Sequence, residues 1–161
     1  MPNGDSPPNM SLAERFDWIL VSFYAGVPAF VGIYGGLNNW EIQQTAGYGV
    51  SLMFYLAHSF VPWWITCLSS SFLMWAMNRI KPPALAIMIP GSLIGCVLTL
   101  PYTNWITSLF EQAWPSSMLS LGGVPAHPWS GDFLEYMIRA TVMWVVVNFV
   151  FDRFVGLPRY R

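Results

Sequence analysis

The stretch "VSLMFYLAHSFVPWWITCLSSSFLMWAM", residues 50–77, contains no Asp, Glu, Lys or Arg. A helix needs about 20 mostly apolar residues to cross the hydrocarbon core of a bilayer. This run is longer than that, and it predicts a membrane-spanning helix around which the rest of the chain is organised.

The whole chain has the composition of a membrane protein. Its 161 residues are 55% hydrophobic and 9% charged, whereas a soluble domain is typically about 25% charged. Because this number of charged residues is too small to cover the surface of a water-soluble fold, we expect a lipid bilayer to surround most of the chain. The N-terminal segment 1–17 is polar and Pro-rich and lacks the features of a signal peptide, so we expect the first apolar run to remain as a membrane helix.

Three further apolar runs lie at about 18–34, 84–100 and 133–154, so the run at 50–77 is the second of four along the chain. The sequence therefore predicts an all-α fold, an integral membrane four-helix bundle that forms a single transmembrane domain with a basic tail at 155–161. Pro28, Pro62 and Pro90 lie inside the first three runs. Since a proline removes the hydrogen bond to the carbonyl four residues earlier, we expect kinked helices. In lipid, the freed carbonyls of Tyr24, His58 and Ala86 need other hydrogen-bond donors, from neighbouring helices, hydroxyl groups or water.

The basic residues indicate the orientation of the bundle. Six of the seven Lys and Arg residues fall on one side of a four-span arrangement, and they are Arg15, Arg79, Lys81, Arg153, Arg159 and Arg161. The opposite loops, about 35–49 and 101–132, contain none. Because cytoplasmic loops carry the excess of Lys and Arg, we expect the N- and C-termini to be cytoplasmic.

The segment "NWITSLFEQAW", residues 104–114, shows helical periodicity between the third and fourth runs. Apolar residues occupy one face and Asn104, Thr107, Ser108 and Glu111 the other. This pattern predicts a short helix that lies in the membrane interface. Within the third run, Gly91 and Gly95 form a small-xxx-small pair, for which we favour a contact within the chain over dimerisation.

His58 is the only histidine in a predicted span and is the candidate cofactor-binding residue. An imidazole inside a membrane is by default a functional candidate. It is suited to a pH switch, to ligation of a haem or pigment metal, or to a hydrogen bond with a bound molecule. We favour the simpler interpretation, a structural hydrogen bond to a neighbouring helix.

Glu135 and Arg139 stand four residues apart at the start of the fourth run, with Asp132 three residues before Glu135. An acid that precedes a base by four residues is the better order for a helical ion pair. A polar cluster at a cavity mouth is one interpretation. We favour a structural ion pair, in which Arg139 extends toward the headgroups.

Enzyme motifs are missing from the sequence. It has no HExxH, no Gly-rich phosphate loop, no CxxC and no nucleophile with a base at a recognisable spacing. We therefore expect no enzyme activity, no catalytic residues and no metal site. The basic residues of the tail are too few for a nucleic-acid surface, so we expect no nucleic-acid partner for this chain itself.

The segment "NFVFDRFVGLPRYR", residues 148–161, resembles the exit of the membrane region in bacterial membrane-bound LytTR-type transcriptional regulators. In that family an N-terminal four-helix membrane module leads into a cytoplasmic DNA-binding domain. The resemblance implies a signal-sensing or anchoring module in the bacterial inner membrane. The DNA-binding domain is absent from these 161 residues, so the resemblance carries over neither DNA binding nor site residues.

A second hypothesis is an accessory subunit of a larger photosynthetic or respiratory membrane complex. Dense aromatic side chains would then pack against lipids, quinones, pigments or neighbouring subunits, and His58 would ligate a pigment. Membrane lipids and other membrane subunits, or a second copy of the chain, are the expected partners under both hypotheses.

Overall fold

The computed structural model describes residues 18–80, 82–115 and 131–155, and every long element in these ranges is helical. Four helices are long and apolar enough to cross a membrane: Trp18–Asn38, Tyr48–Ala76, Leu85–Ala113 and Gly131–Phe154. This confirms the predicted all-α architecture with four spans. The polar segment 1–17 and most of the tail lie outside the described residues.

The first span begins as regular helix, passes through the π-helix η1 (Ser22–Gly26) and continues as α2 (Val27–Asn38). The short helix α3 (Trp40–Ala46) and the long helix α4 (Tyr48–Ala76) follow. The remaining elements are α5 (Leu85–Ala113), α7 (Gly131–Val150) and the π-helix η2 (Phe151–Val155).

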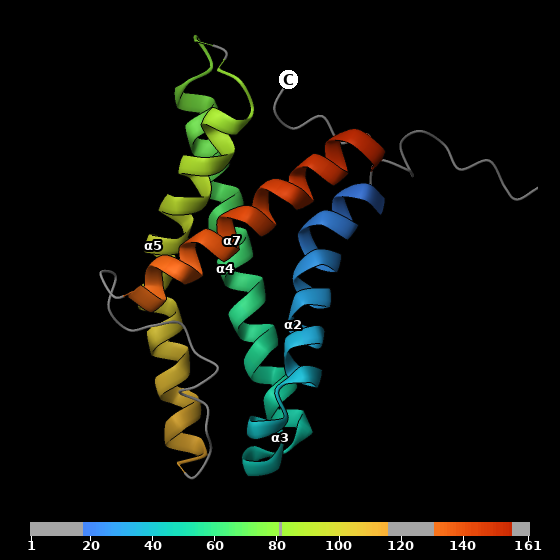
Figure 1. The fold of residues 1–161 in the computed structure, drawn as a ribbon, viewed down its shortest axis with the longest axis vertical. Coiled ribbons are helices and arrows are strands. Elements are labelled where there is room, and N and C mark those ends of the chain that lie inside the picture. The colour runs from blue at the N-terminus through green and yellow to red at the C-terminus, as the bar shows by residue number, and fades with distance from the viewer. Residues whose placement is uncertain (1–17, 81, 116–130, 156–161) are drawn as a thin grey trace, which may run out of the picture.

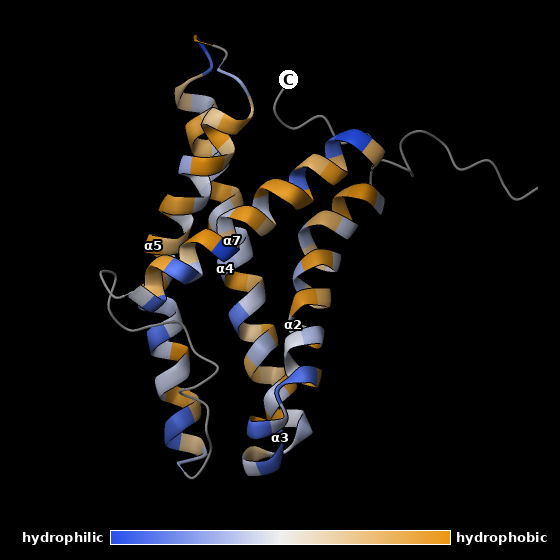
Figure 2. Ribbon diagram, in the orientation of Figure 1, coloured by the Kyte–Doolittle hydropathy of each residue, from blue (hydrophilic) through white to orange (hydrophobic). Residues whose placement is uncertain are grey.

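Helix α4 is the centre of the arrangement, because its most extensive contacts are with α5 and α2. Helix α7 runs obliquely across α4, from the middle of α5 to the beginning of the first span (Figure 1). The rings of Phe23 and Phe151 lie 5.0 Å apart, so both ends of the described bundle meet on one side. Apolar residues dominate the long helices, and polar residues gather near α3 and the end of α5 (Figure 2).

Glycines set the close packing of α4 against its two neighbours. A Cβ atom on Gly91 or Gly95 would lie within 3 Å of the Cα atom of Ser70 or Thr66 on α4. Gly32 and Gly36 of α2 approach Leu56 and Leu52 of α4 equally closely. Small residues allow membrane helices to approach this far. The predicted contact of the Gly91–Gly95 pair within the chain is therefore observed.

The separate helix predicted over 104–114 is not observed, because the helix of the third span does not end at Leu100. Helix α5 continues through Pro101 to Ala113, and residues 104–113 are its last turns. The loss of one backbone hydrogen bond at Pro101 does not end the helix, since contacts with α4 hold the turns beyond it. Phe110 packs edge-on against Phe54, and Thr107 bonds to His58.

A short helix does exist between the first two spans, where none was predicted. Asn39 caps α3, since its side-chain oxygen accepts the backbone N–H of Ile42 at 3.1 Å. Ser51 and Gln43 both donate to the carbonyl of Gly36, at 2.9 and 2.6 Å. These bonds tie the end of α2, α3 and the start of α4 into one corner.

Candidate functional site

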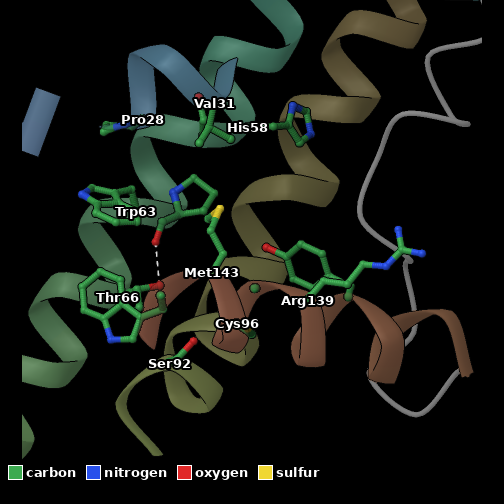
Figure 3. A pocket seen from close by; sticks show the side chains of 14 residues that line it. Pro28, Val31, His58, Trp63, Thr66, Ser92, Cys96, Arg139 and Met143 are labelled. Atoms are coloured by element: carbon green, nitrogen blue, oxygen red, sulfur yellow. Dashed lines mark hydrogen bonds between the residues drawn. The ribbon is translucent and has the colours of Figure 1, made fainter. Parts of the chain in front are cut away.

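A cavity of about 260 Å³ lies where the four spans cross (Figure 3). Its wall is built mainly from apolar side chains: Pro28 and Val31 of α2, Pro62 and Trp63 of α4, Cys96 of α5, and Ala140, Met143 and Trp144 of α7. Polar side chains interrupt this wall at six places: His58, Ser59, Thr66, Ser92, Tyr136 and Arg139. Ligand sites in proteins are commonly concave and mostly apolar, with a few placed polar groups.

Two adjacent tryptophans of α4 hold the first span against this cavity. The N–H of Val27 reaches back to the carbonyl of Ser22, and Pro28 has no N–H to donate. The carbonyls of Phe23 and Tyr24 thereby lose their helical donor. The indole of Trp63 donates to Phe23 at 3.0 Å, and that of Trp64 donates to Tyr24 at 2.9 Å. For the Tyr24 carbonyl, the other partner that the sequence required is therefore an indole of the neighbouring helix.

The same indoles take part in an aromatic cluster. The rings of Trp63 and Trp144 lie 4.9 Å apart in edge-to-face geometry, and Phe23 packs against both. Phe23 and Trp144 are almost fully buried. The cluster joins the first span, α4 and α7 at one end of the cavity wall.

His58 lines the cavity, and both of its ring nitrogens are bonded within the chain. Nδ1 lies 2.8 Å from the carbonyl oxygen of Phe54, and Nε2 lies 3.0 Å from the hydroxyl of Thr107. A carbonyl only accepts, so Nδ1 carries the hydrogen and, in the neutral ring, Nε2 accepts the Thr107 hydroxyl. This arrangement is a hydrogen bond between α4 and α5. A pigment metal would have to displace Thr107 to reach Nε2.

Arg139 and Glu135 form an ion pair at the cavity rim. The stem of Arg139 lines the cavity, while its guanidinium points away from the other labelled side chains (Figure 3). The side chains are 78% and 58% exposed, respectively, so the pair is at the surface of the bundle. Asp132 is exposed in the first turn of α7 and does not line the cavity.

The remaining polar groups of the wall differ in what they offer a ligand. Ser59 donates to the carbonyl of Leu56, and Thr66 donates to that of Pro62, so their hydrogens are used. Ser92 accepts from Thr141 at 3.2 Å, and its own hydroxyl is hydrogen-bonded to the side chain of Cys96. Within the described part of the chain, the hydroxyl of Tyr136 makes no hydrogen bond. Among the described residues, Tyr136 is thus the hydroxyl donor that the wall presents.

Behind the wall, three buried polar atoms lack a partner among the described residues: Ser70 Oγ, Trp144 Nε1 and Asn148 Oδ1. Asn148 does use its amide hydrogen, which it donates to the carbonyl of Trp144 at 2.8 Å. Buried groups of this kind are normally satisfied by protein or ordered water. Ser70 lies against Gly91 where α4 meets α5, and Trp144 and Asn148 lie on α7.

The described residues contain no group of three or more His, Cys, Asp or Glu side chains that suits a metal ion. Cys67 and Cys96 are buried on different helices and are not joined in a disulfide. Sequence reasoning singled out His58 and Arg139, which the fold brings to the same cavity. It missed Tyr136, Trp63 and Trp144 as wall residues. The available signal was the pair of adjacent tryptophans after Pro62, which pointed to Trp63.

Comparisons with family models, with curated proteins and with solved structures found no match to this chain.

Proposed function

We propose that this chain is a non-catalytic, multi-pass membrane module that senses a small lipophilic molecule in the cavity between its helices. The observation that carries the proposal is the position of this cavity. It lies under α7 and is lined by residues of all four spans, so a molecule bound there contacts each of them.

Helix α7 is the element suited to respond. Only 17% of the apolar stretch of its span is buried inside the bundle, compared with 44% for α5. Fewer internal contacts mean a smaller free-energy cost of displacement. A ligand shifts a conformational equilibrium only when it binds one state better, and a cavity partly walled by α7 meets this requirement.

The output of the module would pass along α7 and η2 into the tail. This agrees with the resemblance of residues 148–161 to the exit of LytTR-type membrane modules. In this proposal the protein resides in the bacterial inner membrane, both termini are cytoplasmic and the internal prolines kink the helices around the cavity. Anchoring of a cytoplasmic partner is the simplest form of the same role.

The test is to purify the full chain from its native membranes in mild detergent and identify bound small molecules by mass spectrometry. Ala140→Leu fills the cavity, and Ala86→Leu places the same side chain on the exposed face of α5. We expect a lipophilic molecule to co-purify with wild type and Ala86→Leu but not with Ala140→Leu. Equal retention by all three proteins would reject the cavity as the sensing site.

A second candidate function, an accessory subunit of a larger membrane complex, is favoured by the outer surface. Large aromatic side chains such as Phe30, Phe72 and Trp75 are more than 60% exposed and free to meet lipid or a neighbouring subunit. Native mass measurement separates the two proposals. A lone chain or homo-oligomer supports the sensing module, whereas stable association with other subunits supports the accessory role.

A further inference from the structure

An apolar groove adjoins the cavity on the outside of the bundle. One side is formed by Val27, Phe30 and Val31 of α2, and the other by Met143, Val146 and Val150 of α7. Val31 and Met143 belong to both the groove and the cavity. The two spaces therefore meet at these two side chains, between the first span and α7.

We infer that the cavity and groove together bind an uncharged ring compound with a hydrogen-bond-accepting oxygen and a hydrocarbon tail, the chemistry of a membrane quinone. The ring occupies the cavity and the tail lies in the groove. This inference rests on the proposed function, in which the cavity is a ligand site, and it names the class of ligand.

The size and lining of the cavity match a ring. A dry protein cavity of about 150 Å³ accommodates benzene, and the cavity here measures about 260 Å³. Aromatic side chains from two helices, Trp63 of α4 with Tyr136 and Trp144 of α7, form part of the wall. Flat rings pack favourably against such side chains in edge-to-face or offset geometry.

The charge at the rim disfavours an ionic headgroup. Arg139 lines the cavity and is already paired with Glu135. An anionic head would have to compete with Glu135 for Arg139, and the cavity wall offers no carboxylate for a cation. A neutral head avoids both costs.

The hydrogen-bonding groups favour an acceptor on the ligand. The hydroxyl of Tyr136 has no acceptor among the described residues, whereas Ser92 is hydrogen-bonded to both Thr141 and the side chain of Cys96. A ring carbonyl within reach of the Tyr136 hydroxyl satisfies a donor in a low-dielectric site, where a hydrogen bond is strengthened. A plain acyl chain of a phospholipid fills the groove equally well but leaves this donor unsatisfied.

The experiment uses the full chain in phosphatidylcholine vesicles and a benzoquinone whose ten-carbon tail carries a photoactivatable diazirine. We expect saturable cross-linking to groove residues, with Val31 and Met143 among them. A decyl benzoquinone without the diazirine should compete, whereas decane and decanoic acid should not compete at the same concentration.

Ala140→Leu should abolish the saturable cross-link, and Ala86→Leu should retain it. Val31→Phe fills the same space from α2 and serves if Ala140→Leu does not fold. Tyr136→Phe keeps the ring but removes the donor, and should weaken quinone competition about fivefold to tenfold, the effect of one lost hydrogen bond. Gly26→Leu should interfere with the tail, since a side chain there meets only Ser22 at 3.8 Å and projects into the groove.

Equal cross-linking in Ala140→Leu and Ala86→Leu would overturn the quinone site, and so would equal competition by decane. If a molecule of another class co-purifies with wild type but not with Ala140→Leu, the proposed sensing function stands and the quinone inference falls. If neither experiment shows a ligand that depends on Ala140, both proposals fail together.

Discussion

At the scale of single residues, Trp63 and Trp64 supply hydrogen-bond donors to the helix that Pro28 interrupts. A proline inside a membrane helix leaves backbone carbonyls without donors, and hydrocarbon supplies none. The two adjacent indoles reach the carbonyls of Phe23 and Tyr24 from the neighbouring helix. Trp63 is buried and also packs the core, whereas Trp64 is 47% exposed and contributes mainly its hydrogen bond.

Trp64→Phe should therefore lower the free energy of unfolding by about 1 kcal/mol, the usual value of one interhelical hydrogen bond in a membrane. Trp63→Phe should cost more, about 2 kcal/mol, since it also removes buried contacts. Unfolding in mixed micelles with increasing SDS measures both. Trp75→Phe, at a position 73% exposed, is the control and should change stability little. Equal effects at Trp64 and Trp75 would contradict the bonding role.

His58 is the second residue whose role the fold defines. Because its imidazole joins α4 to α5 through Thr107, His58→Phe and Thr107→Val should each destabilise the bundle by about 1 kcal/mol. The double variant should lose less than the sum, and a double-mutant cycle measures this coupling. Strict additivity would argue against the bond. Loss of a bound pigment in His58→Phe alone would favour the ligating role.

At the scale of elements, glycines allow α4 to approach both α2 and α5 closely. Gly91 and Gly95 lie against Ser70 and Thr66, and Gly32 and Gly36 lie against Leu56 and Leu52. Contacts with α4 also explain why α5 continues past Pro101, since the turns beyond the proline pack against α4. At 29 residues α5 measures about 43 Å, longer than the hydrocarbon core of about 30 Å, so one or both of its ends extend past the core.

Gly95→Ala tests this packing. The new methyl group would lie 2.9 Å from the Cα atom of Thr66, so α4 and α5 must separate, at a cost of about 1–3 kcal/mol. Gly49→Ala is the matched control, because no atom lies within 4 Å of a Cβ at that position and alanine favours the helix. The same SDS unfolding assay compares them. Equal stability of the two variants would show that the close approach is not required.

At the scale of the whole molecule, the bundle brings both of its described ends to one side and its polar corner to the other. Phe23 and Phe151 meet at one end. At the opposite end, Ile42 and Phe54 form a small core with the half-buried Phe110 and Trp114. The even number of spans and the one-sided Lys and Arg residues together predict that the end with the termini is cytoplasmic.

Single cysteines at Gln44 and Asn78 test this orientation. Both side chains are exposed and lie at opposite ends of α4, and the native Cys67 and Cys96 are buried, which keeps background labelling low. A membrane-impermeant maleimide should label Gln44→Cys in cells whose inner membrane is intact. It should label Asn78→Cys only after that membrane is permeabilised. The reverse pattern would invert the topology.

The helical class and the four segments long and apolar enough to cross a membrane follow from the sequence alone, because such runs have few alternatives to a helix in hydrocarbon. The sequence also identified the ion pair of Glu135 with Arg139, which follows from helical spacing. The Gly91–Gly95 pair was likewise identified as a surface that a neighbouring helix can approach closely. These features are local, so the periodicity of one segment is enough to predict them.

Only the tertiary structure decided where α5 ends and that Trp63, Tyr136 and Trp144 share a cavity with His58. Each of these depends on contacts between residues far apart in the chain: Phe110 with Phe54, Thr107 with His58, and Trp63 with Phe23. Hydropathy is a property of a segment, whereas a helix boundary at a proline and the shape of a cavity depend on the free energy of packing between segments.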